Sequence, residues 1–175
     1  MKLLGLLAGL LMFAGQAGAQ ATRVVSGSTL FSIKYWAGTC EGKFGPINGT
    51  AQFDPAKPEA TVIDVYVTAN TFDTDNNMRD KDVKGDKYLN VAAHPQVRFR
   101  STSVTEKDGT YYAKGTMTIK GVAKPMTIPF KARKNADGGY AISSNFTLNR
   151  LDFGVGKSTA TLKDNVSLSI TATIK

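Results

Sequence analysis

Apolar and polar residues alternate with a period of two along most of the chain. The last such stretch is the most regular, since Val166, Leu168 and Ile170 alternate with Ser167 and Ser169. Alternation of this kind is typical of a β-strand that turns one face to a core and the other to water. The pattern predicts eight strands, at residues 31–35, 47–53, 61–69, 97–102, 111–119, 126–132, 140–148 and 166–174.

The alternation breaks in the polar segment between the third and fourth predicted strands. From Asp75 to Pro95 the chain reads DNNMRDKDVKGDKYLNVAAHP. Asp75 and Asn76 are both residue types that cap the start of a helix. Leu89 is one of the few apolar residues here that could pack against a sheet. The segment therefore predicts a short helix, the only one expected after the N-terminal region.

The predicted strands follow one another through short turns, such as Asp108-Gly109, a common hairpin dipeptide. Antiparallel strands in this order remove their exposed edges by closing into an up-and-down barrel. The competing architecture is a two-layer sandwich. The barrel is favoured because the strands are long and the Cys–Trp–Cys pattern of immunoglobulin domains is absent from the sequence.

The inward-facing positions of such a barrel mix small residues with large apolar ones. A barrel of eight strands is either just filled by its side chains or holds one small ligand. Small residues would leave volume, although tapered packing of small against large residues would leave none. The small inward residues are Gly49, Ala51, Ser101, Ala113, Gly115, Ala132, Ser144 and Ala172. The predicted apolar lining of a ligand site is Phe31, Ile33, Ile47, Ala51, Val65, Phe99, Met117, Ile128, Phe146 and Leu168.

The N-terminus has the pattern of a cleaved secretory signal. Lys2 precedes an apolar run from Leu3 to Ala14, which is shorter than the roughly 20 residues of a spanning helix. The run ends in Ala17-Gly18-Ala19, an A-x-A cleavage site. We therefore expect a signal peptide at residues 1–19, a single mature domain at residues 20–175, and export to the periplasm.

The formal charge of +8 is spread along the chain and not gathered in runs. No recognition helix is visible either, so nucleic-acid binding is not expected. Residues 73–84 begin like a 12-residue calcium-binding loop but do not match it. Met78 stands at the position that requires glycine, and Lys84 at the position that requires glutamate. No cluster of cysteine and histidine suggests zinc, so neither a metal nor a cofactor is predicted.

Three segments resemble the YceI-like family of bacterial periplasmic proteins. They read TFDTDNNMRDKDVKGDKYLNVAAHPQVRFRSTSV, GTMTIKGVAKPMTIPFKA and FTLNRLDFGVG. The first is similar to the family's asparagine–arginine–aspartate segment, the second to its glycine-lysine-proline hairpin, and the third to its asparagine-arginine-x-aspartate-phenylalanine-glycine turn. The resemblance spans nearly all of the mature chain. The chain departs from the family in residues 26–53. Family members often have histidine in and just after the first strand, whereas this chain has no histidine there and contains Cys40.

The resemblance implies an all-β fold, a single eight-stranded antiparallel lipocalin-like barrel with a short helix between the third and fourth strands. It also implies a periplasmic carrier for an isoprenoid, quinone-like or fatty-acyl lipid. Arg79 and Arg150 lie in matched motifs, so either could hold the lipid's polar head. Alternatively, either arginine pairs with Asp80 or Asp152 and only fixes a loop.

Two other functions stay open from the sequence. One is a lipid-acting enzyme that uses Cys40 or His94, the single cysteine and the single histidine of the chain. This is the less favoured hypothesis, because nothing in the sequence places the two together and Cys40 can equally be a buried apolar residue. The other is a stress-related periplasmic protein with a filled barrel. Peripheral contact with a membrane and the oligomeric state are left open.

Overall fold

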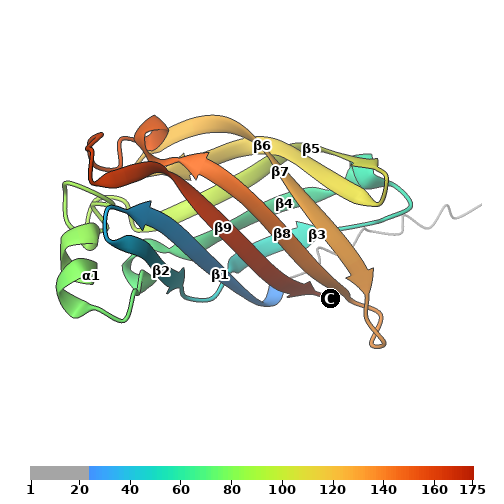
Figure 1. Ribbon diagram of the computed structural model, residues 1–175. Coiled ribbons are helices and arrows are strands. Elements are labelled where there is room, and N and C mark those ends of the chain that lie inside the picture. Colours follow the sequence, from blue (N-terminus) through green and yellow to red (C-terminus); the bar gives the residue numbers. More distant parts are fainter. Residues whose placement is uncertain (1–23) are drawn as a thin grey trace, which may run out of the picture.

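The structure is a computed structural model that describes residues 24–175, and the signal peptide predicted at residues 1–19 lies outside this range. The described residues form one curled antiparallel sheet with a short helix at one end (Figure 1). The strands are β1 (Val24–Tyr35), β2 (Gly38–Phe44), β3 (Asn48–Gln52), β4 (Val62–Thr68), β5 (Gln96–Lys107), β6 (Thr110–Ile119), β7 (Val122–Lys134), β8 (Tyr140–Asn149) and β9 (Leu162–Ile174). The helix is α1 (Asn77–Lys84), and three single 3₁₀ turns are η1 (Pro58–Ala60), η2 (Ala69–Thr71) and η3 (Arg150–Phe153).

The sheet order is β2-β1-β9-β8-β7-β6-β5-β4-β3, a single sheet in the described chain, so the sandwich alternative is wrong. The all-β, lipocalin-like class predicted from the sequence is confirmed, with nine strands in place of the expected eight. The additional strand is β2, which pairs with β1 in the register Ile33↔Cys40. Its sequence, GTCEGKF, hides the alternation because one inward position is Gly42. A side chain at Gly42 would collide with the ring of Phe31, so glycine is required there.

The sheet curls until its two ends approach, and a few contacts close the seam. The backbones of Lys43 in β2 and Asp73 exchange two hydrogen bonds, of 2.9 and 3.0 Å. Their side chains form an ion pair of 3.3 Å. The Asp75 amide and the Lys43 ammonium together hold the pKa of the Asp73 carboxyl below its usual value. The seam therefore joins β2 to the segment that leads into α1.

The end of the barrel remote from α1 is filled by aromatic side chains. The ring of Phe53 packs edge-on against Tyr111 and Tyr140, each 5.0 Å away, and against Phe130 at 5.8 Å. Tyr111 also stacks on Phe130. Edge-to-face contacts at these spacings are the favoured geometry of aromatic pairs. This aromatic group closes one end of the barrel.

Two of the small inward residues, Gly49 and Gly115, are small because neighbouring backbones lie against them. A Cβ on Gly115 would lie 2.2 Å from the Arg100 carbonyl oxygen of the neighbouring strand β5. Gly49 has a φ of +120°, and a Cβ there would lie 2.1 Å from the Asp64 carbonyl oxygen. Glycine is needed at both positions because a side chain cannot fit between the backbones.

Helix α1 forms where the sequence predicts it, and Asn76 caps its N-terminus by accepting a hydrogen bond of 3.0 Å from the Arg79 amide. The buried Asp80 carboxylate accepts bonds from the amide and the hydroxyl of Thr74, at 3.0 and 2.6 Å. Beyond the helix, the Leu89 amide donates to the Val83 carbonyl, which turns the Leu89 side chain into the core. Among residues 24–175, no helix is long and apolar enough to span a bilayer.

Candidate functional site

A cavity of about 830 Å³ occupies the end of the barrel that carries α1. The end of β1, the end of β8 and the start of β9 lie at the same end of the barrel as α1 (Figure 1). The cavity opens there, and none of the four rings of the aromatic group lines it. Its volume lies within the range of about 300–1,000 Å³ that is common for small-molecule sites. The barrel is thus hollow at one end and filled at the other.

Apolar side chains form most of the cavity wall. Phe31 and Phe72 stack at 4.9 Å, and Phe44 meets Phe72 edge-on at 5.6 Å. These three rings line the side formed by β1, β2 and the segment after η2. The other apolar and aromatic residues of the wall are Ile33, Tyr35, Trp36, Val83, Tyr88, Leu89, Val97, Met117, Ile119, Leu148, Val155, Leu162, Val166 and Leu168. A site with this lining can shelter an apolar group from water.

Four of the ten residues predicted as apolar lining lie in the cavity wall, namely Phe31, Ile33, Met117 and Leu168. The structure does not bring the other six to the cavity. Ile47, Ala51 and Val65 pack in a small cluster around Ile174, and Phe99, Ile128 and Phe146 belong to the main core. The eight small inward residues are likewise absent from the wall.

Several wall residues were missed by the sequence reasoning. Leu148 and Val166 stand at inward positions of alternating strands, so the pattern marked them as inward without showing which half of the barrel is hollow. Phe72 and Leu89 come from the segment without periodicity. Only the path of the chain around α1 brings these two to the cavity.

Arg79 and Cys40 meet at the cavity wall, one from α1 and the other from β2. The Arg79 Nη1 lies 2.8 Å from the Cys40 Sγ and donates to it. This hydrogen bond is the main cause that raises the pKa of Arg79 above its usual value, and the charge of Asp80 adds to it. Of the five N–H donors of a guanidinium, this is the one that Arg79 uses among the described residues. Arg79 therefore presents a permanent positive charge to the cavity.

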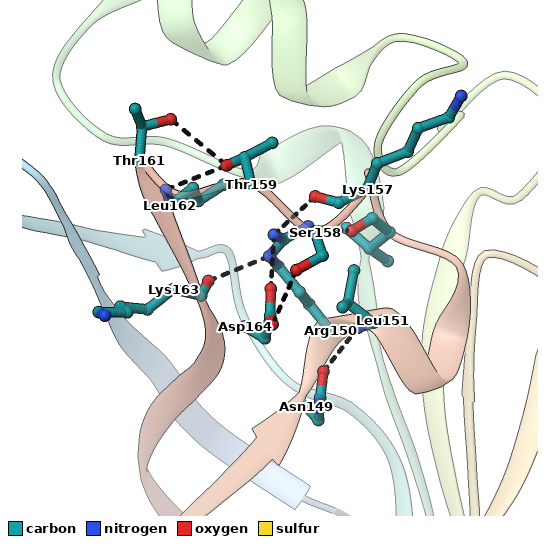
Figure 2. Close-up of polar contacts among 11 residues, drawn as sticks. Asn149, Arg150, Leu151, Lys157, Ser158, Thr159, Thr161, Leu162, Lys163 and Asp164 are labelled. Carbon is teal, nitrogen blue, oxygen red and sulfur yellow. Dashed lines mark hydrogen bonds and ion pairs between the residues drawn. The ribbon is translucent and has the colours of Figure 1, made fainter.

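Arg150 also reaches the cavity wall, but its donors are largely engaged (Figure 2). Only 4% of the residue is exposed. Its guanidinium donates to the carbonyl oxygens of Lys163, Val155 and Lys157, at 3.1, 2.7 and 2.9 Å. It also forms an ion pair of 2.9 Å with Asp164. Arg150 thus fastens η3 and the loop after it to the start of β9.

Among the described residues, no ion pair joins Arg79 or Arg150 to Asp80 or Asp152, the pairing considered from the sequence, although the charge of Asp80 acts on Arg79. Asp80 is held by Thr74, and the partner of Arg150 is Asp164. The general idea that Arg150 fixes a loop is nevertheless supported by its four hydrogen bonds.

The two candidate catalytic residues have different surroundings. Cys40 contacts Arg79 in the cavity wall. His94 lies against Gly121 in the β6–β7 turn and is outside the cavity wall. Within residues 24–175, no group of three or more histidine, cysteine, aspartate or glutamate residues is placed to hold a metal ion.

Comparison with solved structures finds the same fold in several bacterial proteins. BcnA of Burkholderia cenocepacia superposes with a TM-score of 0.79 over 84% of this chain and 95% of its own, at 23% identity. The YceI protein of Campylobacter jejuni gives 0.69 over 77% and 83%, at 27% identity. A domain from Saccharophagus degradans described as polyisoprenoid-binding gives 0.70 over 89% and 98%, at 8% identity, a likeness of fold alone.

Sequence comparison identifies the family. A UPF0312 protein of Yersinia pestis is 34% identical over 164 residues, which cover 87% of this chain and 85% of the relative. A UPF0312 protein of Pectobacterium atrosepticum is 31% identical over 134 residues, which cover 74% and 70%. The family model described as YceI-like domain matches residues 20–174. The resemblance inferred from the three sequence motifs is confirmed, and the chain belongs to the YceI-like family.

Proposed function

We propose that this protein is a periplasmic carrier that holds the apolar tail of an amphipathic lipid in the cavity beside α1. The ligand class is an isoprenoid, quinone-like or fatty-acyl lipid, with its polar head at the open end. The observation that carries the proposal is the cavity of about 830 Å³ with its predominantly apolar wall. Burial of an apolar tail contributes about 25 cal/mol per Å² before the cost of ordering the ligand, so few polar contacts are needed.

Membership of the YceI-like family supports this proposal, as does the similar fold of a domain described as polyisoprenoid-binding. The hollow end of the barrel argues against the alternative of a filled, purely structural barrel. The alternative of a lipid-acting enzyme has no comparable support, because His94 lies outside the cavity wall that contains Cys40. The periplasmic location rests on the export signal predicted at residues 1–19.

Native mass spectrometry of the protein purified from its own source tests the proposal. We expect a defined additional mass that organic solvent removes and that is identified as a lipid. Protein stripped in this way is then expected to bind a lipid of the same class again, one molecule per chain. Purified protein that carries no lipid, and that also fails to bind isoprenoid, quinone and fatty-acyl probes, would contradict the proposal.

Arg79 is the stronger candidate for the head-group contact, because Arg150 already donates four hydrogen bonds within the protein. We expect Arg79→Met to weaken binding of a fatty acid by about tenfold, the size of one charge-assisted hydrogen bond. A fatty alcohol with the same tail should lose much less, because it carries no negative charge. Titration of both probes into stripped wild-type and variant protein makes the comparison. Equal losses for acid and alcohol would show that Arg79 does not recognise the head.

A further inference from the structure

Four separate segments form one rim around the open end of the cavity. The Trp36 amide, in the β1–β2 turn, donates to the Thr161 carbonyl before β9 at 2.9 Å. The Lys120 ammonium, in the β6–β7 turn, donates to the carbonyls of Lys87 and Gly154 at 3.2 and 3.0 Å. These bonds tie the two turns to the segment after α1 and to the loop after η3. We call the β1–β2 and β6–β7 turns, residues 77–91 and residues 154–161 the mouth rim.

The most exposed large apolar side chains of the described chain lie on the mouth rim. Trp36 and Met78 are each 80% exposed. The next most exposed are Leu30 and Val62 on the strands, at 52% and 51%. An isolated exposed apolar residue needs no explanation. Trp36 lines the cavity, however, and Met78 stands on α1, the helix that contributes Arg79 and Lys81 to the same wall. Two such exposed residues on one end of the barrel suggest a surface that is covered in use. Tryptophan in particular favours the boundary between water and the acyl region of a bilayer.

Basic side chains accompany these two apolar residues. Lys81 and Lys87 contribute to the cavity wall at its opening, together with Asp82 and Asp86. Residues 77–91 hold four basic and three acidic side chains. One of the acids, Asp80, is buried and bonded to Thr74. The segment then carries two more basic than acidic side chains, an excess supplied by the half-buried Arg79 and Lys84, while the fully exposed lysines and aspartates balance.

The loop after η3 adds to this positive charge. Its Lys157 is exposed, and the charge of the nearby Asp164 is matched by Arg150. Each exposed lysine close to an anionic bilayer contributes about 1 kcal/mol of attraction. The charge of the rim therefore complements a negatively charged lipid surface.

We propose that the mouth rim docks on the surface of an anionic bilayer. Trp36 and Met78 enter the boundary between head groups and acyl chains, and the rim lysines lie at the level of the lipid phosphates. The cavity then opens directly toward the bilayer, so a tail moves between cavity and membrane without crossing water. This last step rests on the proposed lipid-carrier function, whereas the docking itself does not.

Trp36 is the only tryptophan of the chain, so its fluorescence reports on the mouth rim. Trp36 also lines the cavity, so its emission responds to lipid uptake as well, and sedimentation with the vesicles decides docking. The protein is mixed with phosphatidylcholine vesicles, with or without one third phosphatidylglycerol, and the vesicles are sedimented. We expect binding to the anionic vesicles, little binding to the neutral ones, and release at about 1 M salt, where screening acts within about 3 Å. Trp36 emission should shift to the blue and be quenched by lipids brominated near the head group.

The double variant Trp36→Ser/Met78→Ser is expected to bind anionic vesicles at least about tenfold more weakly, because it removes the apolar part of the contact. Leu30→Ser/Val62→Ser is the matched control, since it removes two exposed apolar side chains from the strands. Lys81→Glu/Lys87→Glu should also weaken binding, and Lys131→Glu/Lys134→Glu on β7 should have less effect. Equal binding of both apolar double variants, or equal binding to neutral and anionic vesicles, would overturn the proposal. So would a dimer through Trp36 that does not bind vesicles.

The test also separates docking from lipid carriage. Met78 is not part of the cavity wall, so Met78→Ser should take up lipid from solution as the wild type does and from vesicles more slowly. Vesicle binding by a protein that takes up no lipid would support docking and contradict the carrier function. Lipid uptake without vesicle binding would support the carrier function and contradict docking.

Discussion

Replacing Val166 with tryptophan is expected to weaken lipid binding at least about tenfold without loss of fold stability. Val166 stands on β9 opposite Ile33, and both side chains line the cavity. The indole would occupy space that the lipid tail needs. In the unliganded protein the same indole would fill an apolar hollow, so its added volume need not strain the core. The two readouts are titration with a fluorescent lipid and denaturant unfolding of stripped protein.

Two control variants separate occupation of the cavity from general damage. Asn165→Trp places the same side chain on the outer face of β9 and should leave binding unchanged. Ala113→Leu enlarges a residue that is 1% exposed in the filled core, and over-packing there should lower the free energy of unfolding by about 1–3 kcal/mol or more. If Val166→Trp lost stability as Ala113→Leu does, the α1 end would be packed and not hollow. Unchanged lipid binding by Val166→Trp would place the ligand elsewhere.

The strand pattern made the fold predictable, and it failed only where glycine interrupts it. Alternation along β9 identifies a half-buried strand because a side-chain period of two has no other common cause. In β2 the inward positions are Cys40, Gly42 and Phe44, and Gly42 is small because the ring of Phe31 occupies its space. That requirement involves a residue on another strand, so no local pattern could show it. The ninth strand was therefore missed.

The position of the cavity could not be predicted from residue size. Gly49 and Gly115 suggested free volume, but each is small because a neighbouring backbone lies against it. The hollow end is instead lined by large residues whose side chains do not meet across it. Whether opposing walls meet depends on where α1 and Leu89 cover the barrel. Their position is set by the path of the chain in three dimensions, which a local sequence pattern does not show. Sequence alone could indicate an apolar interior but not which half of it is open.

The sequence placed Arg79 and Arg150 in similar roles, and the structure distinguishes them through burial and partners. Both belong to recognisable motifs and both reach the cavity wall. Arg79 contacts a cysteine and is partly exposed, whereas Arg150 is enclosed by three carbonyl oxygens and a carboxylate. The partner of Arg150 lies 14 residues further along the chain, across the loop after η3. The position of Arg150 in a motif indicated that the residue has a role, but it did not show whether that role is to bind a ligand or to hold a loop.

Arg150→Met is expected to lower the free energy of unfolding by about 3 kcal/mol, because it leaves buried acceptors without a donor. The carbonyl oxygens of Val155, Lys157 and Lys163 would lose their bonds, and Asp164 would lose its counter-ion. Urea unfolding of stripped protein at neutral pH measures the change. Arg150→Lys should recover only part of the loss, since an ammonium cannot span acceptors arranged for a planar guanidinium.

Arg79→Met provides the matched comparison for this prediction. Arg79 is partly exposed and donates a single hydrogen bond, to Cys40, among the described residues, so its replacement should cost less than about 1 kcal/mol. The two variants should therefore differ in their effects: Arg150→Met should lower the stability of the fold, and Arg79→Met should lower the affinity for an anionic lipid. An Arg150→Met protein that unfolds at the wild-type urea concentration, yet binds the fatty acid weakly, would assign the head-group contact to Arg150. The loop between η3 and β9 would then be held in place by its other contacts.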